Sequence, residues 1–597
     1  MPLRHQQPLH AKDATLLTLP FFDDFSVPAI SFGQWDLGGA YVNQGYAPLP
    51  PTVGMVTLDA FDAEGVLYPT ALGQTFGGDT LTSYPIRLDS IFTPYPRKLT
   101  ADDSVYISFF YMPGGGYGNM WERVGDVPEE GDSLVLEFNV PGDTVWHHVW
   151  ESCGQQADSL FAHSGNYWQF VNLHIADPRY LQKGFRFRFR NHCSLDNVSK
   201  RGLLSNADQW NIDYVHIAAD RSYLDSISRD VAFVNPAPSL LKNYQAMPAK
   251  QYVLSEMKDS LALTIANLYS DELAINYGYT IRNQQDEAVH TYVGGFENAP
   301  VYWRGHQYQT APVHARPELR YAFPMDMQAP AVYTVVHGLR EGVSGDAHTQ
   351  NDTVRFVQTF DNYYAYDDGT AENGYGITST SSRVRLCCQF NLNVEDTLTA
   401  LNLYFNRTLN DENEEISFYL TVWDDAGGRP GNIIYQDQER RRPLFRGLNQ
   451  FVRYELEEPL VCSGTVYIGL EQTTADYINL GFDRNNDASN RIFFLTSANW
   501  QTSILRGALM LRPYFGQLQP LSIDSHMTPQ FEVYAQNGRI TITPGQLGTV
   551  AVFDLMGRVV YRASSAGPQS QIITPPLPGG VYLVRVGSCP AKKVVVL

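Results

Sequence analysis

Carboxylate side chains in two distant segments of the chain are candidates for binding a cation. Asp23 and Asp24 lie in "FFDDFS", just before the first predicted strand, and Asp213 lies in "WNIDYVHI", the last strand predicted for the same region. When the first and last strands of a β-sandwich are neighbours, such carboxylates approach one another, and Ca²⁺ takes six to eight oxygen ligands from scattered groups. The sequence therefore predicts a structural calcium site at Asp23, Asp24 and Asp213, with turn-capping Asp residues as the alternative.

Two further segments combine several oxygen donors. The first, "YDDGTAENG", holds Asp367, Asp368, Glu372 and Asn373, which could surround a cation. Its Asp-Gly and Asn-Gly pairs are also strong turn signals, and we favour two turns. The second, "DRNNDASN", has neither the EF-hand spacing nor the closing Glu of that loop, so it predicts an ordinary loop.

Three arginines alternate with three phenylalanines in "FRFRFRN". Successive side chains of a strand point to opposite faces, so the rings are predicted to enter the core and the arginines to share the other face. The arginines are Arg186, Arg188 and Arg190, and the rings are Phe185, Phe187 and Phe189. The arginines could bind carboxylates or sugars. A solvated outer face with acidic partners on neighbouring strands is the alternative.

Aromatic residues alternate in the same way in "WHHVW". The pattern predicts Trp146, His148 and Trp150 on one face and His147 on the other. If that face is exposed, it could stack on sugar rings. Packing in the core is the default for two tryptophans at this spacing.

Catalytic motifs are absent from the sequence, which has no HExxH, no GxSxG and no P-loop lysine motif. Glycoside hydrolysis needs only two carboxylic acids at a suitable separation, which a sequence does not reveal. Glu137 and Glu151, each on a predicted strand, are the candidates in the first domain. A hydrolase therefore stays an alternative to a binding protein.

The composition predicts a modular all-β protein. The chain has 597 residues, enough for several domains, with 44% hydrophobic and 13% aromatic residues, 47 Gly and 35 Pro. The formal net charge of -20 disfavours nucleic acid and anionic lipid surfaces as partners. No apolar run is long enough to span a bilayer as a helix.

Strand patterns separated by Gly- and Pro-rich turns divide the chain into tandem β-sandwiches. We predict a jelly roll, an immunoglobulin-like sandwich, a second jelly roll and a small C-terminal β-sandwich. The expected ranges are an N-terminal tail at 1–20, domains at 21–219, 220–360 and 361–516, a linker at 517–530 and the last domain at 531–597.

Several phrases resemble modules of Bacteroidota surface proteins. "FFDDFS", "GDTLTSYPIRL" and "WNIDYVHI" make the first domain similar to MAM and concanavalin-like jelly rolls. "YYAYDDGTAENGYGI" and "GALMLRPYFG" make the third similar to a second jelly-roll type of the same secreted proteins.

The last 70 or so residues closely resemble the C-terminal sorting domain of type IX secretion cargo, also called the Por secretion tail. "NGRITI", "VAVFDLMGRVVY", "LPGGVYLVRV" and "KKVVVL" occur in the order of that family. The resemblance implies export through a Sec leader and the type IX translocon, and removal of the domain by a sortase near the linker. The implied sorting residues are Asp554, Gly557, Gly580, Tyr582, Lys592 and Lys593. The first residues lack the apolar segment of a signal peptide, so we expect a leader upstream or already removed.

The six cysteines do not have zinc-site spacing. In an oxidising compartment Cys153 could pair with Cys193, and Cys387 or Cys388 with Cys462. Small buried hydrophobic side chains are the equal alternative.

Together these patterns predict a secreted or cell-surface binding or adhesion protein whose ligand is a glycan or a protein. A secreted hydrolase on a jelly-roll scaffold and a structural subunit of a surface assembly are the alternatives. Structural calcium is the one cofactor that the sequence suggests.

Overall fold

The computed structural model describes residues 16–63, 65–71, 74–114, 127–195, 208–225, 229–299, 316–327, 329–341, 345–377, 384–406, 416–474, 478–496, 498–516, 531–536, 538–543, 549–554, 559–564, 572–586 and 592–596. The chain forms two compact units, Met1–Gly516 and Gln517–Leu597. Within the described residues nearly all regular structure is β, and the two α-helices, α1 (Pro28–Gln34) and α2 (Ala157–Ser164), are short. The predicted all-β class is confirmed.

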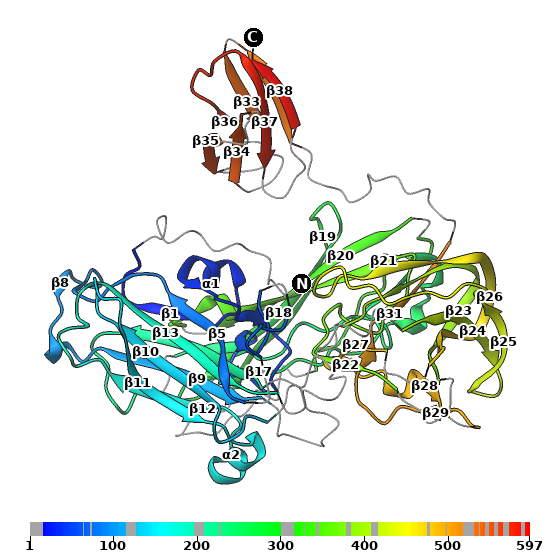
Figure 1. The fold of residues 1–597 in the computed structure, drawn as a ribbon, viewed down its shortest axis with the longest axis horizontal. Coiled ribbons are helices and arrows are strands. Elements are labelled where there is room, and N and C mark those ends of the chain that lie inside the picture. Colours follow the sequence, from blue (N-terminus) through cyan, green and yellow to red (C-terminus); the bar gives the residue numbers. More distant parts are fainter. Residues whose placement is uncertain are drawn as a thin grey trace. The chain divides into compact units, whose positions relative to one another are not determined.

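The first sandwich consists of two six-stranded sheets. One has the order β12-β9-β14-β4-β3 with β1 paired to β14, and the other has the order β11-β10-β13-β5-β2 with β6 paired to β13 (Figure 1). The strands are β1 Phe21–Asp23, β2 Trp35–Asp36, β3 Tyr41–Asn43, β4 Met55–Leu58, β5 Phe76–Ser83, β6 Ile86–Arg87, β9 Tyr106–Pro113, β10 Ser133–Asn139, β11 Trp146–Cys153, β12 Gln169–His174, β13 Lys183–Cys193 and β14 Trp210–Ala218, with a separate hairpin of β7 Ser90–Ile91 and β8 Arg97–Lys98.

The core of the first sandwich follows the alternation of its strands. Phe185, Phe187 and Phe189 are fully buried between the sheets, which confirms the prediction for their face of β13. Trp35 packs edge-on against Phe187 with 5.2 Å between ring centroids.

The second sandwich combines a five-stranded sheet with a two-stranded one. The larger sheet has the order β16-β21-β20-β18-β19, and β15 pairs with β17 in the smaller one. The strands are β15 Val231–Phe233, β16 Ala246–Pro248, β17 Ile265–Asn267, β18 Leu273–Arg282, β19 Ala288–Ala299, β20 Ala331–Glu341 and β21 Thr353–Asp361. Every second residue of β18 is buried, because one face of this strand covers the core.

The third sandwich is built on two long, bent strands, β23 (Val384–Leu403) and β26 (Val452–Gln472). Its seven-stranded sheet has the order β25-β24-β26-β23-β28-β29 with β31 paired to β23, and β22-β27-β30 form a second, three-stranded sheet. The remaining strands are β22 Asn373–Tyr375, β24 Phe418–Asp425, β25 Pro430–Gln436, β27 Leu480–Asp483, β28 Ile492–Leu495, β29 Gln501–Thr502, β30 Ala508–Leu509 and β31 Leu511–Phe515.

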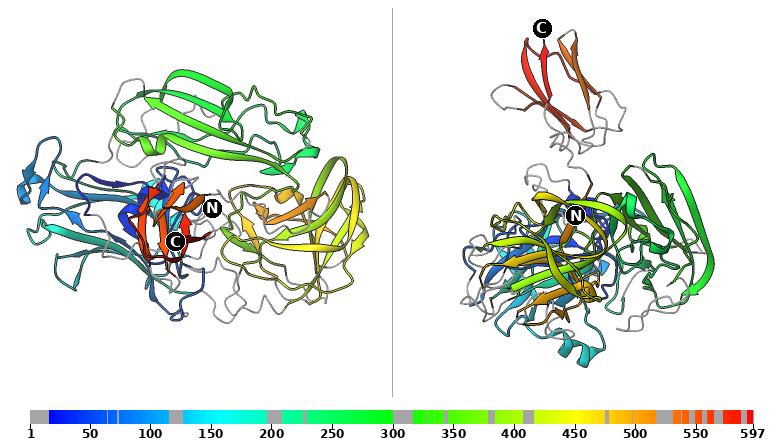
Figure 2. Two further views of the ribbon diagram at one scale, coloured as in Figure 1. Left: turned by 90° about the horizontal axis from the view of Figure 1, so that it is seen from above. Right: turned by 90° about the vertical axis from the view of Figure 1, so that its right-hand side faces the viewer.

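The C-terminal unit is a small sandwich with its own core. A three-stranded sheet, β32-β33-β36, faces a four-stranded sheet, β35-β34-β37-β38 (Figures 1 and 2). The strands are β32 Glu532–Gln536, β33 Arg539–Thr543, β34 Thr549–Phe553, β35 Val559–Ser564, β36 Ile572–Ile573, β37 Gly580–Val586 and β38 Lys592–Val596. The core includes Ile540, Ile542, Val552 and Val584, all fully buried.

Apolar contacts also cross between the sandwiches of the first unit. Met55 and Phe110 of the first sandwich share a buried cluster with Val234 and Leu268, which adjoin the small sheet of the second. One hydrophobic cluster then extends from Val231 to Phe515, through the second and third sandwiches. These shared clusters make Met1–Gly516 one compact unit, and the finer division at residues 219 and 360 stays a prediction.

Five cysteines are free thiols: Cys153 is exposed, and Cys193, Cys387, Cys388 and Cys462 are buried. The four buried cysteines match the alternative to disulfide pairing, in which they are small side chains packed in the interior. The sixth, Cys589, lies outside the described residues. Among the helices that the structure describes, none combines the length and apolar character needed to cross a membrane.

We expect residues 531–597 to fold alone and to unfold cooperatively. Ile542 is fully buried, whereas Ile573 is 52% exposed. Ile542→Ala should lower the free energy of unfolding of this fragment by about 2 to 5 kcal/mol, and Ile573→Ala by less than about 1 kcal/mol. Urea denaturation followed by circular dichroism measures both. A fragment without a cooperative transition, or equal effects of the two substitutions, would contradict an independent core.

Candidate functional site

A cavity of about 810 Å³ lies where segments of all three sandwiches of the first unit meet. The first sandwich contributes Phe25, Pro28 and Val42–Pro48, the second Asn235–Pro238, Gln245 and Arg355–Val357, and the third Asp368, Thr370, Glu372, Asn449 and Arg484–Asn486. Most of the charged and amide side chains of the wall come from the third sandwich. All of these except Asn449 lie in the segments "YDDGTAENG" and "DRNNDASN".

Antiparallel pairing of β22 with β27 explains why these two loops are neighbours. Asn373 at the start of β22 pairs with Phe482 near the end of β27. The residue before β22, Glu372, therefore lies beside the residues that follow Phe482. The backbone N–H of Arg484 donates to Glu372 Oε2 at 2.8 Å, which closes the pair of loops.

Asp368 presents its carboxylate to the cavity. One oxygen accepts hydrogen bonds from the N–H and hydroxyl of Thr370, at 2.9 and 2.6 Å. The other accepts from the side-chain amides of Asn485 and Asn486, at 3.2 and 3.4 Å. Asp368 is exposed, and it is held in place by neutral donors.

Two further carboxylates lie behind Asp368. Asp483 is fully buried and accepts hydrogen bonds from the backbone N–H groups of Asp368 and Asn485, both at 2.7 Å. Glu372 is 4% exposed, and the Thr370 hydroxyl that reaches Asp368 also lies 2.7 Å from Glu372 Oε1. Three acids thus share one small volume.

Burial and mutual repulsion shift these acids toward their neutral forms. Burial, and after it the charge of Asp368, raises the pKa of Glu372 to about 8. Burial, followed by the charges of Asp368 and Glu372, raises the pKa of Asp483 well above its usual range. Asp368 is accessible from the cavity, but the protein around it removes part of its hydration and so raises its pKa as well.

The first sandwich reaches this site through the loop after β3. Asn43 Oδ1 accepts from the backbone N–H of Tyr46 at 3.1 Å, and the Tyr46 hydroxyl donates to the carbonyl of Ala371 at 3.0 Å. A Cβ atom at Gly45 would lie 2.4 Å from the Asn485 side-chain amide, so a larger residue there would displace that side chain.

The second sandwich contacts the same loop of the third. Gln245 Nε2 donates to Asn486 Oδ1 at 2.7 Å, while Asn486 Nδ2 donates to Asp483 at 2.8 Å. The Asn486 side chain therefore links the second sandwich to the acids of the third.

This arrangement suits the binding of a polar molecule. An exposed carboxylate accepts hydrogen bonds, amides both donate and accept, and Arg355 and Arg484 also line the wall. Convergent polar groups in a concave site of this size are typical of ligand pockets.

Sequence reasoning did not identify these residues as one site. "DRNNDASN" was expected to be a loop, and its Asn485 and Asn486 are loop residues, but their contact with Asp368 depends on strand pairing between distant segments. The prediction of an Asn-Gly turn is wrong, because Asn373 and Gly374 belong to strand β22. A Cβ at Gly374 would lie 2.0 Å from Asn479 Oδ1, so this glycine permits close packing within a sheet. The sequence feature that could have indicated this site is the cluster of oxygen donors in each of the two segments.

The residues predicted to bind calcium are only partly brought together. Asp23 accepts hydrogen bonds from the Phe25 N–H and the Trp35 indole, both at 2.8 Å. Asp24 and Asp213 are fully buried, and after burial the charge of Asp24 is the largest cause that raises the pKa of Asp213. Asp213 accepts from the backbone and hydroxyl of Thr52.

Asp24 takes part in a contact between the first and second sandwiches. The Asn351 side-chain amide donates to Asp24 at 3.0 Å and to Asp230 at 3.1 Å. Asp230 also accepts from the Tyr214 hydroxyl at 2.8 Å. Protein donors thus occupy the predicted site, and calcium at Asp23, Asp24 and Asp213 stays a prediction.

The arginines on the outer face of β13 have an acidic partner on a neighbouring strand, as the alternative of a solvated outer face required. Arg188 and Arg190 form ion pairs with the buried Glu137 at 2.6 and 3.1 Å. The Arg186 side chain donates to the Ser83 carbonyl at 3.1 Å. Glu151 instead contacts His148 at 3.3 Å, and the described contacts do not join Glu137 and Glu151 into an acid pair.

The prediction for "WHHVW" is wrong. Trp150 packs into the core, edge-on against Phe109 at 5.1 Å. Trp146 lies on the opposite face, where the Arg188 guanidinium covers its ring at 4.4 Å. The register of β10 with β11 shifts between Leu136 and Glu137, so one extra residue reverses the alternation.

The residues implied as a sorting signal lie in the C-terminal unit. Gly580 begins β37, and Tyr582 is buried there with its hydroxyl donating to the Pro578 carbonyl at 2.9 Å. Lys592 donates to the Phe531 carbonyl at 2.6 Å, and Lys593 is exposed beside it on β38. Asp554 follows β34, and Gly557 lies outside the described residues.

Comparisons with known proteins show no family. A scan against family models and a search of curated proteins both return no match. Among solved structures, a Parabacteroides merdae β-glucuronidase is similar at a TM-score of 0.19 and 11% identity, over 51% of this chain and 29% of that one. The tandem CBM22 domains of Paenibacillus barcinonensis Xyn10C give a TM-score of 0.18 and 9% identity, over 82% of this chain and 100% of that one.

A β-glucuronidase 2 of Bacteroides uniformis gives a TM-score of 0.19 at 11% identity, over 58% of this chain and 35% of that one. The chain therefore spans less than a third of the first β-glucuronidase and about a third of the second. TM-scores this low do not indicate a shared overall fold, so functional conclusions rest on the site's own geometry.

The stability of the protein should depend on the proton held by Glu372. In the unfolded chain this proton leaves near pH 4.5, but in the folded chain it is retained up to about pH 8. The contribution of Glu372 to the free energy of unfolding is therefore most favourable at low pH, and it falls as the pH rises from 4.5 through 8. Glu372→Gln should flatten this decline by up to about 1.4 kcal/mol for each pH unit.

Urea denaturation between pH 5 and 8 measures this slope. Glu439→Gln, at an exposed glutamate of the same sandwich, is the matched control and should keep the slope of the unsubstituted protein. Equal slopes for Glu372→Gln and the unsubstituted protein would contradict the raised pKa.

Proposed function

We propose that this protein is a cell-surface or secreted binding protein that holds a glycan in the cavity between its three large sandwiches. The observation that carries this proposal is the set of hydrogen-bonding groups around Asp368. Asp368, Asn485 and Asn486 form one contiguous polar edge, with an acceptor flanked by two amides. Neighbouring hydroxyls of a sugar ring act as both donors and acceptors, so they can bond to such an edge in pairs.

The size and shape of the site support a glycan over a protein ligand. A volume of about 810 Å³ lies within the range of small-molecule pockets. Protein partners usually bind over larger surfaces of about 800 Å² on each side. A short oligosaccharide fits the cavity, with the half-buried Tyr46 on the wall for apolar contact with a ring face.

Hydrolysis of a glycan is the second candidate function. Glu372 has a pKa of about 8, which makes it a proton donor at neutral pH, and Asp368 provides a second carboxyl group. Two points favour binding instead. Glu372 is nearly inaccessible, and both of its oxygens already lie in hydrogen-bond contacts, with the Thr370 hydroxyl and the Arg484 backbone N–H. One threonine hydroxyl reaches both acids, whereas hydrolysis needs the acids on opposite sides of the bond that is cleaved.

Substitutions on the polar edge should weaken glycan binding. A glycan array screened with the full chain identifies a ligand, and calorimetry measures its affinity. Asp368→Asn and Asn485→Ala should each weaken binding about tenfold or more, because each removes hydrogen bonds to a charged group or to the ligand. Asp286→Asn, at an aspartate 84% exposed in the second sandwich, should bind like the unsubstituted protein.

Two results would count against the binding proposal. Unchanged affinity in Asp368→Asn and Asn485→Ala would place the ligand elsewhere. Release of new reducing ends from the bound glycan, lost in Glu372→Gln, would favour the hydrolase.

We further propose that residues 531–597 direct export by the type IX system. The support is the resemblance of this segment to sorting domains, together with a fold that has its own core and forms a separate compact unit. A folded module at one end of the chain is available to a translocon and a sortase as a recognition surface.

Export should leave a cut within residues 517–530. Mass spectrometry of culture supernatant from a Bacteroidota host with a type IX system should detect chains that end in this segment. The same host should retain a variant that lacks residues 592–597, because β38 completes the sheet. Intact chains kept inside the cells in both cases would contradict the sorting role.

A further inference from the structure

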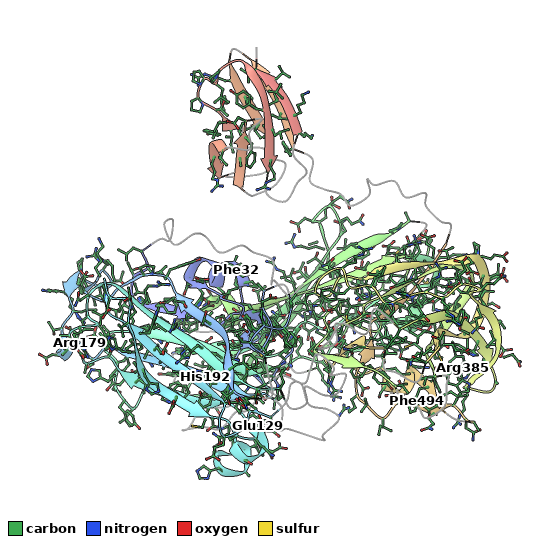
Figure 3. All side chains as sticks on the ribbon, in the orientation of Figure 1. Phe32, Glu129, Arg179, His192, Arg385 and Phe494 are labelled. Carbon is green, nitrogen blue, oxygen red and sulfur yellow. The ribbon has the colours of Figure 1, made fainter. Side chains whose placement is uncertain are left out.

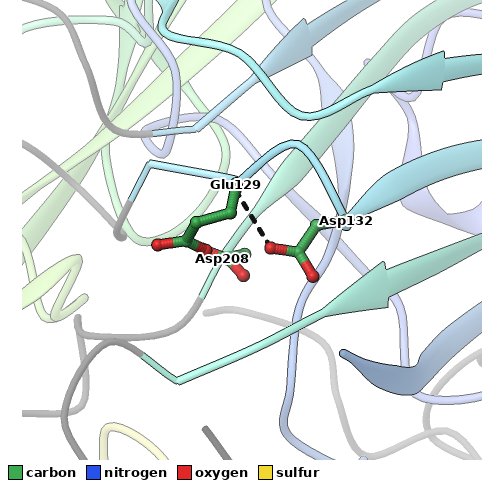
Figure 4. A group of neighbouring side chains, drawn as sticks. All are labelled: Glu129, Asp132 and Asp208. Carbon is green, nitrogen blue, oxygen red and sulfur yellow. Dashed lines mark hydrogen bonds between the residues drawn. The ribbon is translucent and has the colours of Figure 1, made fainter. Parts of the chain in front are cut away.

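Three carboxylates converge at one end of the first sandwich, and none of them lines the cavity. Glu129 and Asp132 lie in the turn before β10, and Asp208 lies just before β14. One oxygen of each lies within 4.8 Å of an oxygen of both others. Figure 4 shows the three side chains directed at the same small volume, and Figure 3 labels Glu129 on the first sandwich.

Ser194 lies at the centre of these carboxylates. Its hydroxyl oxygen is 2.9 Å from Glu129 Oε2, 3.0 Å from Asp132 Oδ2 and 3.2 Å from Asp208 Oδ2. A serine hydroxyl carries one proton and can donate to one of these oxygens at a time. The other two contacts bring lone pairs together, which is unfavourable unless a positive charge or a further proton lies between them.

Among the residues that the structure describes, these acids have no cationic partner. Asp132 is fully buried and Asp208 is 1% exposed. No lysine, arginine or histidine in the described part of the chain forms an ion pair with any of the three acids. Isolated buried carboxylates are strongly disfavoured, so groups of this kind are normally paired or bound to a metal.

An unpartnered oxygen is the second sign of a missing ligand. Asp208 Oδ2 accepts from the backbone N–H of Ser194 at 2.6 Å, but Asp208 Oδ1 is buried and has no hydrogen-bond partner. Buried polar atoms nearly always have a partner, from protein, water or an ion. Burial and the neighbouring carboxylates also raise the pKa of Asp208, as expected where like charges lack compensation.

We propose that Glu129, Asp132 and Asp208 bind one calcium ion, with the Ser194 hydroxyl as a neutral oxygen beside it. All available donors are oxygens, which favours a hard cation over zinc or copper. Calcium accepts irregular cages of six to eight oxygens, whereas magnesium requires a near-ideal octahedron.

The position of the site gives the ion a structural role. Asp132 adjoins β10 and Ser194 follows β13, both in one sheet, whereas Asp208 adjoins β14 in the other. A calcium ion would therefore tie the two sheets together at this end of the first sandwich. An ion that binds only the folded state raises its stability by mass action.

The test uses the full chain, stripped with EDTA and titrated with CaCl₂ by calorimetry. Glu129 is exposed, so Glu129→Gln leaves the core intact, and Glu130→Gln at the exposed neighbour is the matched control. We expect calcium to bind the unsubstituted protein and Glu130→Gln alike, and Glu129→Gln at least tenfold more weakly. Asp208→Asn should lose the same binding event.

Thermal denaturation supplies an independent readout. Calcium should raise the melting temperature of the unsubstituted protein and of Glu130→Gln, but not of Asp208→Asn. The proposal is overturned if calcium does not bind, if Glu129→Gln and Asp208→Asn bind as the control does, or if magnesium binds there in place of calcium.

Discussion

The pairing of β22 with β27 is the constraint on which the cavity depends, because it brings two acidic loops together that lie far apart in the chain. Asp368 and Asp483 are separated by 115 residues, yet the backbone of one donates to the carboxylate of the other. Repulsion between such groups would separate free loops. Strand hydrogen bonds hold them, and backbone N–H groups at the strand ends, which have no partner in the sheet, provide the compensating dipoles.

Neutral donors also stabilise buried acids where the first and second sandwiches meet. Asp24 and Asp230 are both fully buried, and a single asparagine amide from the next sandwich lies between them. Neutral donors thus stabilise acids in a chain with a formal charge of -20. Burial raises the pKa of these carboxyl groups, and hydrogen bonds from neutral donors offset only part of that rise.

The sequence predicted which side chains are buried where this depends only on alternation within one strand. The burial of Phe185, Phe187 and Phe189 follows from strict alternation within one strand. The same rule failed for Trp146 and Trp150, because a bulge between them inserts one residue, and a bulge has no clear signal in "WHHVW".

Local sequence patterns could not predict contacts between distant segments. The cavity needs several segments from each sandwich, and its polar edge forms only after β22 and β27 have paired. Composition identified the acidic loops, but strand order decides which of them meet. The predicted calcium residues illustrate this limit, since Asp24 and Asp213 approach each other while Asp23 turns to Trp35.

The cavity wall has a thermodynamic consequence because it draws on three sandwiches at once. Tyr46, Gln245 and Asn486 each join a different sandwich to this wall. A molecule bound there would favour only the state in which all three are folded and docked. Occupancy would then couple their unfolding transitions, so that three segments with separate sheets would melt as one cooperative body.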